Sequence, residues 1–420
     1  MFLLRVLTRG AALALCLAVT PTQAQPDDWA RWLQGRLAEL PAHRAIGARV
    51  DAELAQSRAR AQPLYNPELM IGYENGAENT RTVGIGQTVD WSGKARSAGR
   101  VSQVLDRLAE VRGEKARARL TADAIQALIA FDAAQRRLRA ASLQEQRLQR
   151  LAELIRRRES AGDLGRVDAT LAWLSLGRAQ QSLAEQESRA IAAATVLRQR
   201  LAVETPARPL PEAALWRDHG AAPTGGAQAS YELRLAELQL NLAERGVDLS
   251  RRDQRSDPTL SVRAGREGDE NLWGLDFSLP LPLFNTGEPE YQAALADQER
   301  RQALLENTRN DIQASLDGAL RDYHQWRTRW QNWRRLAGER LEGADDLMER
   351  VWRQGELSTQ DYLQALDRNL ESRLSGVALR EAMQNAWIEW LYRSARLQPW
   401  LADLTATPTH PETLASGAPQ

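Results

Sequence analysis

Two long stretches of this chain predict helices far longer than a compact domain can bury. Residues 93–160 contain no proline and are rich in Ala, Leu, Arg, Glu and Gln, which are strong helix formers. About 65 such residues form a rod of roughly 100 Å. Residues 287–353 have a similar composition, with Pro289 in the first turn, where proline is tolerated. Such rods need partner helices along their length, so the sequence predicts a coiled-coil arrangement.

The second constraint on the fold is an internal repeat. Four landmarks recur at one offset, between 191 and 194 residues. Self-similarity at a fixed spacing predicts an architecture built from repeated units. The pairs are Asn66-Pro67-Glu68-Leu69 with Asp257-Pro258-Thr259-Leu260, Gly93 with Gly287, Gly162-Asp163-Leu164 with Gly355-Glu356-Leu357, and Asp168 with Asp361.

Each copy predicts the same order: a helix, two short strands, a very long helix and a returning helix. The proline- and glycine-containing segment 204–228 predicts a linker between the copies, and the tail from Ala402 predicts disorder. The predicted organisation is a first repeat over 25–203 (strands within 66–91, helices 93–160 and 167–203), the linker, a second repeat over 229–396 (strands within 258–280, helices 287–353 and 359–396) and a tail over 397–420.

The first 24 residues predict an export signal. Arg5 and Arg9 precede an apolar stretch, and a small-residue cleavage site ends at Ala24. The stretch is too short for a spanning helix of about 20 residues. Cys16 follows Leu15, where a lipoprotein site needs a small residue, so lipidation is not expected. Without Cys16 the exported chain has no cysteine, which excludes disulfides and thiolate metal sites.

The four short strand segments alternate apolar and polar residues, and charge falls on one side only. Period-two alternation over about nine residues fits a tilted membrane strand with one lipid face and one wet face. The wet side is predicted to line a lumen with Glu68, Glu74, Asp90, Arg263 and Asp276. The apolar side is predicted to carry an aromatic girdle of Tyr73, Trp91, Trp273 and Phe277.

Four strands do not close a barrel, and unpaired edges in lipid cost several kcal/mol per exposed group. Three copies of the chain supply about 12 strands and remove every edge. The sequence therefore predicts a homotrimer in outer-membrane lipid. The alternative is a pair of amphipathic hairpins on a soluble core, which is the favoured interpretation of any single strand taken alone.

The strand motifs resemble those of the TolC family of outer-membrane efflux proteins. They are Asn66-Pro67-Glu68-Leu69, then the stretch from Thr82 to Lys94, and the stretch from Leu279 to Gly287, which is similar to the heavy-metal, CzcC-like branch. The resemblance covers essentially the whole exported chain. It implies a mainly α protein in which a helical coiled-coil barrel in the periplasm continues into a transmembrane β-barrel of a Gram-negative outer membrane. It also implies a mixed belt from segments around 27–42, 204–228 and 397–420.

The resemblance further implies partners, namely a periplasmic adaptor protein and an inner-membrane pump of the RND type. The adaptor-contact candidates are the tunnel-tip turns Gly162, Asp163, Leu164, Gly355, Glu356 and Leu357. An acidic ring at the pore entrance is implied at Asp361, with Asp367, Gln364 and Asp168 as further candidates. The chain departs from the family pattern at Gln364, where a second acid is expected, and at Leu357, which stands where an arginine is expected shortly after Gly355. Independently of the family, Asp361 also fits an ordinary acidic residue in the first turn of a helix.

Other function classes find little support. The chain carries 55 basic and 55 acidic residues, so net charge does not indicate nucleic-acid binding. His43, His219, His324 and His410 are scattered without metal-ligand spacing, and no phosphate loop or nucleophile motif is present. No cofactor, metal or catalytic activity is expected. The competing hypotheses are a passive efflux channel and a periplasmic coiled-coil adaptor or scaffold without a pore.

Overall fold

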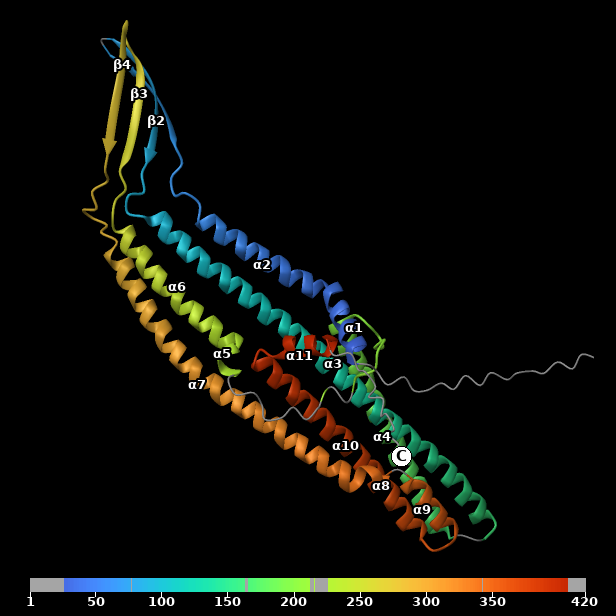
Figure 1. Cartoon of the computed structure of the whole chain (residues 1–420). Helices are drawn as coiled ribbons and strands as arrows, with labels where there is room; N and C mark the ends of the chain where they lie inside the picture. The colour runs from blue at the N-terminus through green and yellow to red at the C-terminus, as the bar shows by residue number, and fades with distance from the viewer. Residues whose placement is uncertain are drawn as a thin grey trace, which may run out of the picture.

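The computed structural model describes residues 26–76, 78–162, 165–211, 215, 226–341 and 343–406; the predicted signal peptide lies outside them. A small sheet stands at one end of a long stack of helices (Figure 1). The elements are α1 Pro26–Glu39, α2 Pro41–Arg60, β1 Glu68–Asn75, β2 Asn79–Thr88, α3 Lys94–Ser160, α4 Arg166–Leu201, α5 Gly226–Ala229, α6 Tyr231–Asp253, β3 Thr259–Glu267, β4 Glu270–Ser278, α7 Glu288–Trp333, a π-helical segment Arg334–Gly338, α8 Glu339–Leu341, α9 Ala344–Arg353, α10 Thr359–Arg393 and α11 Leu397–Ala406.

The sheet joins the two halves of the chain. Its order is β1-β2-β3-β4 with every neighbouring pair antiparallel, so β2 and β3 pair across the halves. The mainly α fold with four strands is confirmed. The same order of helix, two strands and long helix occurs in each half, while duplication of the sequence itself stays a prediction.

The first predicted rod is one continuous helix. α3 has 67 residues, so it is about 100 Å long. It packs against α2 and α6 near the sheet and against α4 and α10 farther away. Val101, Val104 and Leu108 are all buried on it, as their spacing predicts.

The second rod, predicted as one helix over 287–353, is wrong as a continuous helix. α7 ends at Trp333, a π-helical segment follows, and α9 begins only after Gly343, whose φ of 78° is left-handed. A left-handed glycine ends a helix, and a π segment accommodates an extra residue. The Trp333 ring packs on α10 at Gly376, where an added Cβ would lie 2.2 Å from the ring.

The largest core lies midway along the helices. It contains Trp29 and Leu33 of α1, Leu197 of α4 and Leu397 of α11, each with no exposed surface. Figure 1 shows α1 and α11 beside α3 at this level. The prediction of disorder from Ala402 onwards is wrong for residues 402–406, which continue α11 because Leu397, Trp400 and Leu401 bury one side of it. Residues 407–420 lie outside the described part of the chain.

Candidate membrane sheet and tunnel tip

One side of the sheet is an uncovered apolar surface, called here the apolar face. Ile71 is 79% exposed and Trp273 81% exposed. Their neighbours in the register are apolar across all four strands, so the side chains form continuous rows. An apolar patch of this kind marks an interaction with lipid or protein. The face consists of Leu69, Ile71, Val83, Ile85, Leu260, Val262, Ala264, Trp273, Leu275 and Phe277.

The opposite side of the sheet is polar and lined by glycines. Arg263 Nε lies 3.3 Å from Asp276 Oδ2. Glycines flank the arginine on both neighbouring strands: a Cβ added at Gly84 would lie 3.0 Å from Arg263 Cβ, and one at Gly274 2.9 Å from its Nε. The glycines therefore leave room for the Arg263 side chain to lie across the sheet. The register places on this side the predicted lumen residues Glu68, Glu74, Arg263 and Asp276; that they line a lumen stays a prediction.

The placement of Asp90 and Trp91 in the second strand is wrong. β2 ends at Thr88, and the Asp90 carboxylate accepts the backbone N–H groups of residues 93–95 at 2.8–2.9 Å. Burial raises the pKa of Asp90, but these hydrogen bonds and the charge of Lys94 outweigh it, so the pKa is lowered. Asp90 is thus a cap for α3, whose first N–H groups need acceptors. Trp91 leaves the sheet and donates its indole N–H to Ser256 O at 2.7 Å.

The sheet is fastened to the helices by a buried carboxylate, Asp257. Its side chain is 1% exposed and its Oδ2 lies 3.0 Å from Lys94 Nζ, at the start of α3. The Tyr65 hydroxyl donates to the same carboxylate at 2.8 Å. Burial, followed by this hydrogen bond, raises the pKa of Tyr65 to about 12. Asp257 thus joins the chain before β3 to the chain before β1 and to the start of α3.

The far end of the helices carries two matching turns. Gly162 after α3 and Gly355 after α9 both have left-handed φ, 83° and 80°. After α9, Glu356 N donates to Val351 O at 3.2 Å, the bond that closes a helix around such a glycine. Asp163 and Leu164 lie outside the described residues. Glu356 is exposed and Leu357 partly buried at this end. Contact of these turns with an adaptor stays a prediction.

The predicted pore-entrance residues lie on the helices that follow these turns. Ser358 caps α10: its Oγ accepts Asp361 N at 3.1 Å and lies 2.6 Å from Asp361 Oδ2. Asp361 and Gln364 are exposed, whereas Asp367 is partly buried and lies 3.7 Å from Arg178 of α4. Burial raises the pKa of Asp367, and the Arg178 charge opposes this. Asp168 stands in the first turn of α4, where no side-chain cap bond is formed.

A separate hydrophobic core stabilises this end of the helices. It draws on α3, α4, α9 and α10, with Ile155 and Leu366 fully buried. The Trp352 and Tyr362 rings stack at 5.3 Å between centroids. Asp345 of α9 is buried and pairs with Arg147 of α3 at 2.6 Å. These contacts fix the turns on a packed four-helix end, even though the helix before α9 is interrupted.

Comparison with known proteins shows which solved structures this geometry resembles. The sequence matches no family profile and no curated protein sequence. Among solved structures, CusC, described as forming a transmembrane channel, superposes with a TM-score of 0.74 at 14% identity, covering 88% of this chain and 92% of CusC. The CmeC outer-membrane channel of Campylobacter jejuni gives 0.72 at 12% identity over 96% and 97% of the two chains, and the open MtrE outer-membrane channel of Neisseria gonorrhoeae gives 0.70 at 15% identity over 88% and 89%.

The chain has the fold of an outer-membrane channel. This confirms the fold expected from the TolC-family resemblance. The heavy-metal branch stays a prediction. Within the described part of the chain, no helix combines the length and apolar character needed to cross a membrane.

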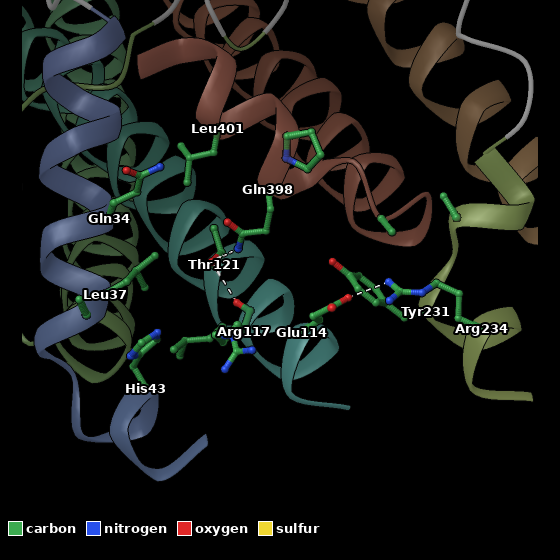
Figure 2. Close-up of a pocket in the computed structure, with 15 residues that line it drawn as sticks. Gln34, Leu37, His43, Glu114, Arg117, Thr121, Tyr231, Arg234, Gln398 and Leu401 are labelled. Carbon is green, nitrogen blue, oxygen red and sulfur yellow. Dashed lines mark hydrogen bonds and ion pairs between the residues drawn. The ribbon is translucent and has the colours of Figure 1, made fainter. Parts of the chain in front are cut away.

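The channel fold contains a cavity at the level of the large core (Figure 2). It measures about 780 Å³ and is lined from α1, α2, α3, α5, α6 and the segment around α11. Its polar groups bind one another: Arg234 Nη1 donates to Glu114 at 2.7 Å, and Gln398 Nε2 donates to Thr121 Oγ1 at 3.0 Å. These bonds link α3 to α6 and to α11, so the cavity walls join these helices at the level of the large core.

Two sets of residues in this channel fold were not predicted from the sequence. The pair Lys94 and Asp257 is 163 positions apart, and only the β2–β3 pairing brings it together. Arg81 and Arg266 lie within the predicted strand segments and belong to β2 and β3, but the sequence prediction assigned them to neither face of the sheet. Continuing the alternation by one step would have placed both arginines on the apolar face.

Proposed function

We propose that this chain is one protomer of a trimeric outer-membrane efflux channel, a passive exit route without catalytic activity. The observation that carries the proposal is the four-stranded sheet whose two faces are uncovered and whose edge strands, β1 and β4, each have one neighbour. Every residue of β1 is exposed. In water such an apolar, open-edged sheet would aggregate.

Contact with lipid and with two further copies of the chain covers the apolar face and the open strand edges. Strands of 8 to 10 residues at about 3.3 Å each, tilted by roughly 40°, rise by about 20–25 Å, close to the apolar band of about 25 Å in an outer membrane. Lipid then covers the apolar face, and β1 of one copy pairs with β4 of the next. Three copies close a wall of about 12 strands whose polar faces surround the lumen.

The helices then extend from the membrane into the periplasm as a tunnel. Its end, with the turns at Gly162 and Gly355, is where we place the contact with a periplasmic adaptor and, through it, an inner-membrane pump of the RND type. Support comes from the exposure of these turns on a packed helical end. The pump selects the cargo, so the heavy-metal assignment is part of the proposal and rests on the sequence resemblance alone.

The pore entrance is proposed at Asp361 of α10. Its carboxylate and Gln364 share an exposed side of the helix, while Tyr362, Leu363 and Leu366 face the core. Threefold symmetry about an axis on the exposed side brings three carboxylates together. At about 10 Å and an effective dielectric constant near 20, each pair repels by roughly 1–2 kcal/mol, which favours bound cations or an open entrance.

Detergent extraction and conductance measurements test the proposal. The exported chain is expected in the outer-membrane fraction, to need detergent for solubility, and to conduct in planar bilayers as a trimer. The alternative is a periplasmic coiled-coil adaptor or scaffold. A monomer that stays soluble without detergent and forms no conducting pore would establish that alternative and refute the channel.

A further inference from the structure

Two arginines of the sheet lie directly opposite each other near the hairpin ends. Arg81 of β2 pairs with Arg266 of β3 in the register, and both side chains are exposed. Because side chains alternate along a strand, both lie on the side of Val83 and Ala264, which form the next row of the apolar face. The arginines therefore mark the end of the apolar face that is farthest from the helices (Figure 1).

The charge of this pair is not balanced within the protein. Like charges directly opposite each other destabilise an antiparallel pair. Across the described residues, no carboxylate is within ion-pair distance of either guanidinium; Arg266 Nε donates instead to the neutral Asn271 Oδ1 at 3.3 Å.

The acidic residues within the strands near the hairpin ends lie on the other side of the sheet, while Glu78 and Asp269 lie in the turns. Glu74, Glu267 and Glu270 belong to one register row, which runs through Thr80. That row alternates with the row of Arg81 and so faces the polar side. Within the strands, carboxylates and guanidinium groups are thus separated onto opposite faces, so the two arginines are open to an anion from outside the protein.

We propose that Arg81 and Arg266 bind the phosphate group of a membrane lipid whose acyl chains lie on the apolar face. The inference rests on the proposed function, which puts this face in lipid. Opposite Cβ atoms are about 5 Å apart in such a pair, so both guanidinium groups reach one phosphate, and each offers a fork of N–H donors. Tyr73 lies beside Arg81 in the same row, an aromatic position typical of a membrane interface.

The occupant is a lipid because the basic pair continues directly into apolar rows. Below Arg81 and Arg266 come the rows of Val83 and Ala264 and then of Ile85 and Val262. A phosphate on the arginines would leave acyl chains lying along these rows. In the proposed orientation the surrounding leaflet is the outer one, so the lipid is a phosphorylated glycolipid of the cell surface.

Native mass spectrometry of the detergent-solubilised trimer tests this inference. The probes are bisphosphorylated lipid A, a phosphate-free glycolipid with similar acyl chains, and inorganic phosphate. We expect the double variant Arg81→Gln with Arg266→Gln to bind lipid A about thirtyfold more weakly, because each arginine contributes separately at a membrane surface. The control Arg263→Gln, on the same strand but on the polar face, should bind lipid A as the parent does.

The outcomes separate this inference from the proposed function. A double variant that assembles and binds lipid A with unchanged affinity overturns the lipid site and leaves the channel intact. Equal binding of the phosphate-free glycolipid, or displacement of lipid A by micromolar inorganic phosphate, also overturns it. If the double variant does not assemble, each single variant should still weaken lipid A binding by about fivefold. A parent chain that forms no trimer refutes the proposed function itself.

Discussion

Replacing Asp257 by alanine should weaken the junction between the sheet and the helices more than any other single carboxylate change nearby. The substitution leaves the Lys94 ammonium, 12% exposed, without its partner at 3.0 Å, and it leaves the partly buried Tyr65 without the acceptor of its hydroxyl. Breaking a buried ion pair by removing one partner costs about 3–5 kcal/mol. Because Lys94 keeps some contact with solvent, we expect about 3 kcal/mol.

A graded set of variants separates charge from hydrogen bonding. Asp257→Asn keeps an acceptor for Tyr65 and should cost less than alanine. Lys94→Met combined with Asp257→Asn removes both charges, so its cost should fall below the sum of the single changes by about 1–2 kcal/mol. The matched control is Asp248→Ala, which breaks the half-exposed pair with Arg100 at 3.4 Å and should cost less than about 1 kcal/mol.

Guanidinium unfolding of the detergent-solubilised protein, followed by tryptophan fluorescence, gives these free energies. Tyr65 adds a pH signature. Because its pKa is raised from 10.0 to about 12 in the folded chain, its contribution to stability is complete below pH 10 and is lost as pH rises through about 12. Asp257→Ala should reduce that alkaline loss. Equal stability of Asp257→Ala and Asp248→Ala would refute the assigned role of the junction.

Three further substitutions test the remaining assignments. Asp90→Ala should lower stability by about 1–2 kcal/mol through loss of the α3 cap. This cost should shrink as pH falls through the lowered pKa of Asp90. If the variant instead changes conductance at unchanged stability, Asp90 lines the lumen and is not a cap. Gly376→Ala should cost about 1–3 kcal/mol, because its Cβ would meet the Trp333 ring at 2.2 Å, and Trp333→Leu should relieve that cost; a neutral Gly376→Ala would contradict the packing. Asp361→Ala should alter single-channel conductance or block by divalent cations, and unchanged values of both would reject its place at the pore entrance.

Most of the fold could be predicted from regular patterns in the sequence. The unbroken α3 follows from its lack of proline, and the two faces of the sheet follow from strict alternation at positions such as Ile71 and Trp273. The resemblance to a known family supplied the way these parts combine. Local periodicity is a property of one segment, so it survives whatever that segment packs against.

The errors came from contacts that no single segment encodes. Asp90 continues the alternation of β2, but the free N–H groups at the start of α3 compete for its carboxylate. The break before α9 depends on Gly343 and on the fit of Trp333 against Gly376, a residue of another helix. That Arg81 and Arg266 lie opposite each other depends on the pairing between the two halves.

Closure of the sheet by neighbouring copies is the central claim, and cysteine cross-linking between the edge strands tests it most directly. The one cysteine of the sequence, Cys16, lies in the predicted export signal, so Met70→Cys in β1 can be combined in turn with Leu272→Cys, Gly274→Cys and Asp276→Cys in β4. The account predicts that at least one combination gives covalent dimers and trimers in outer membranes, while the within-chain pair Val83→Cys with Ala264→Cys gives only monomers. Efficient cross-linking of that control alongside edge pairs that all stay monomeric would contradict the account.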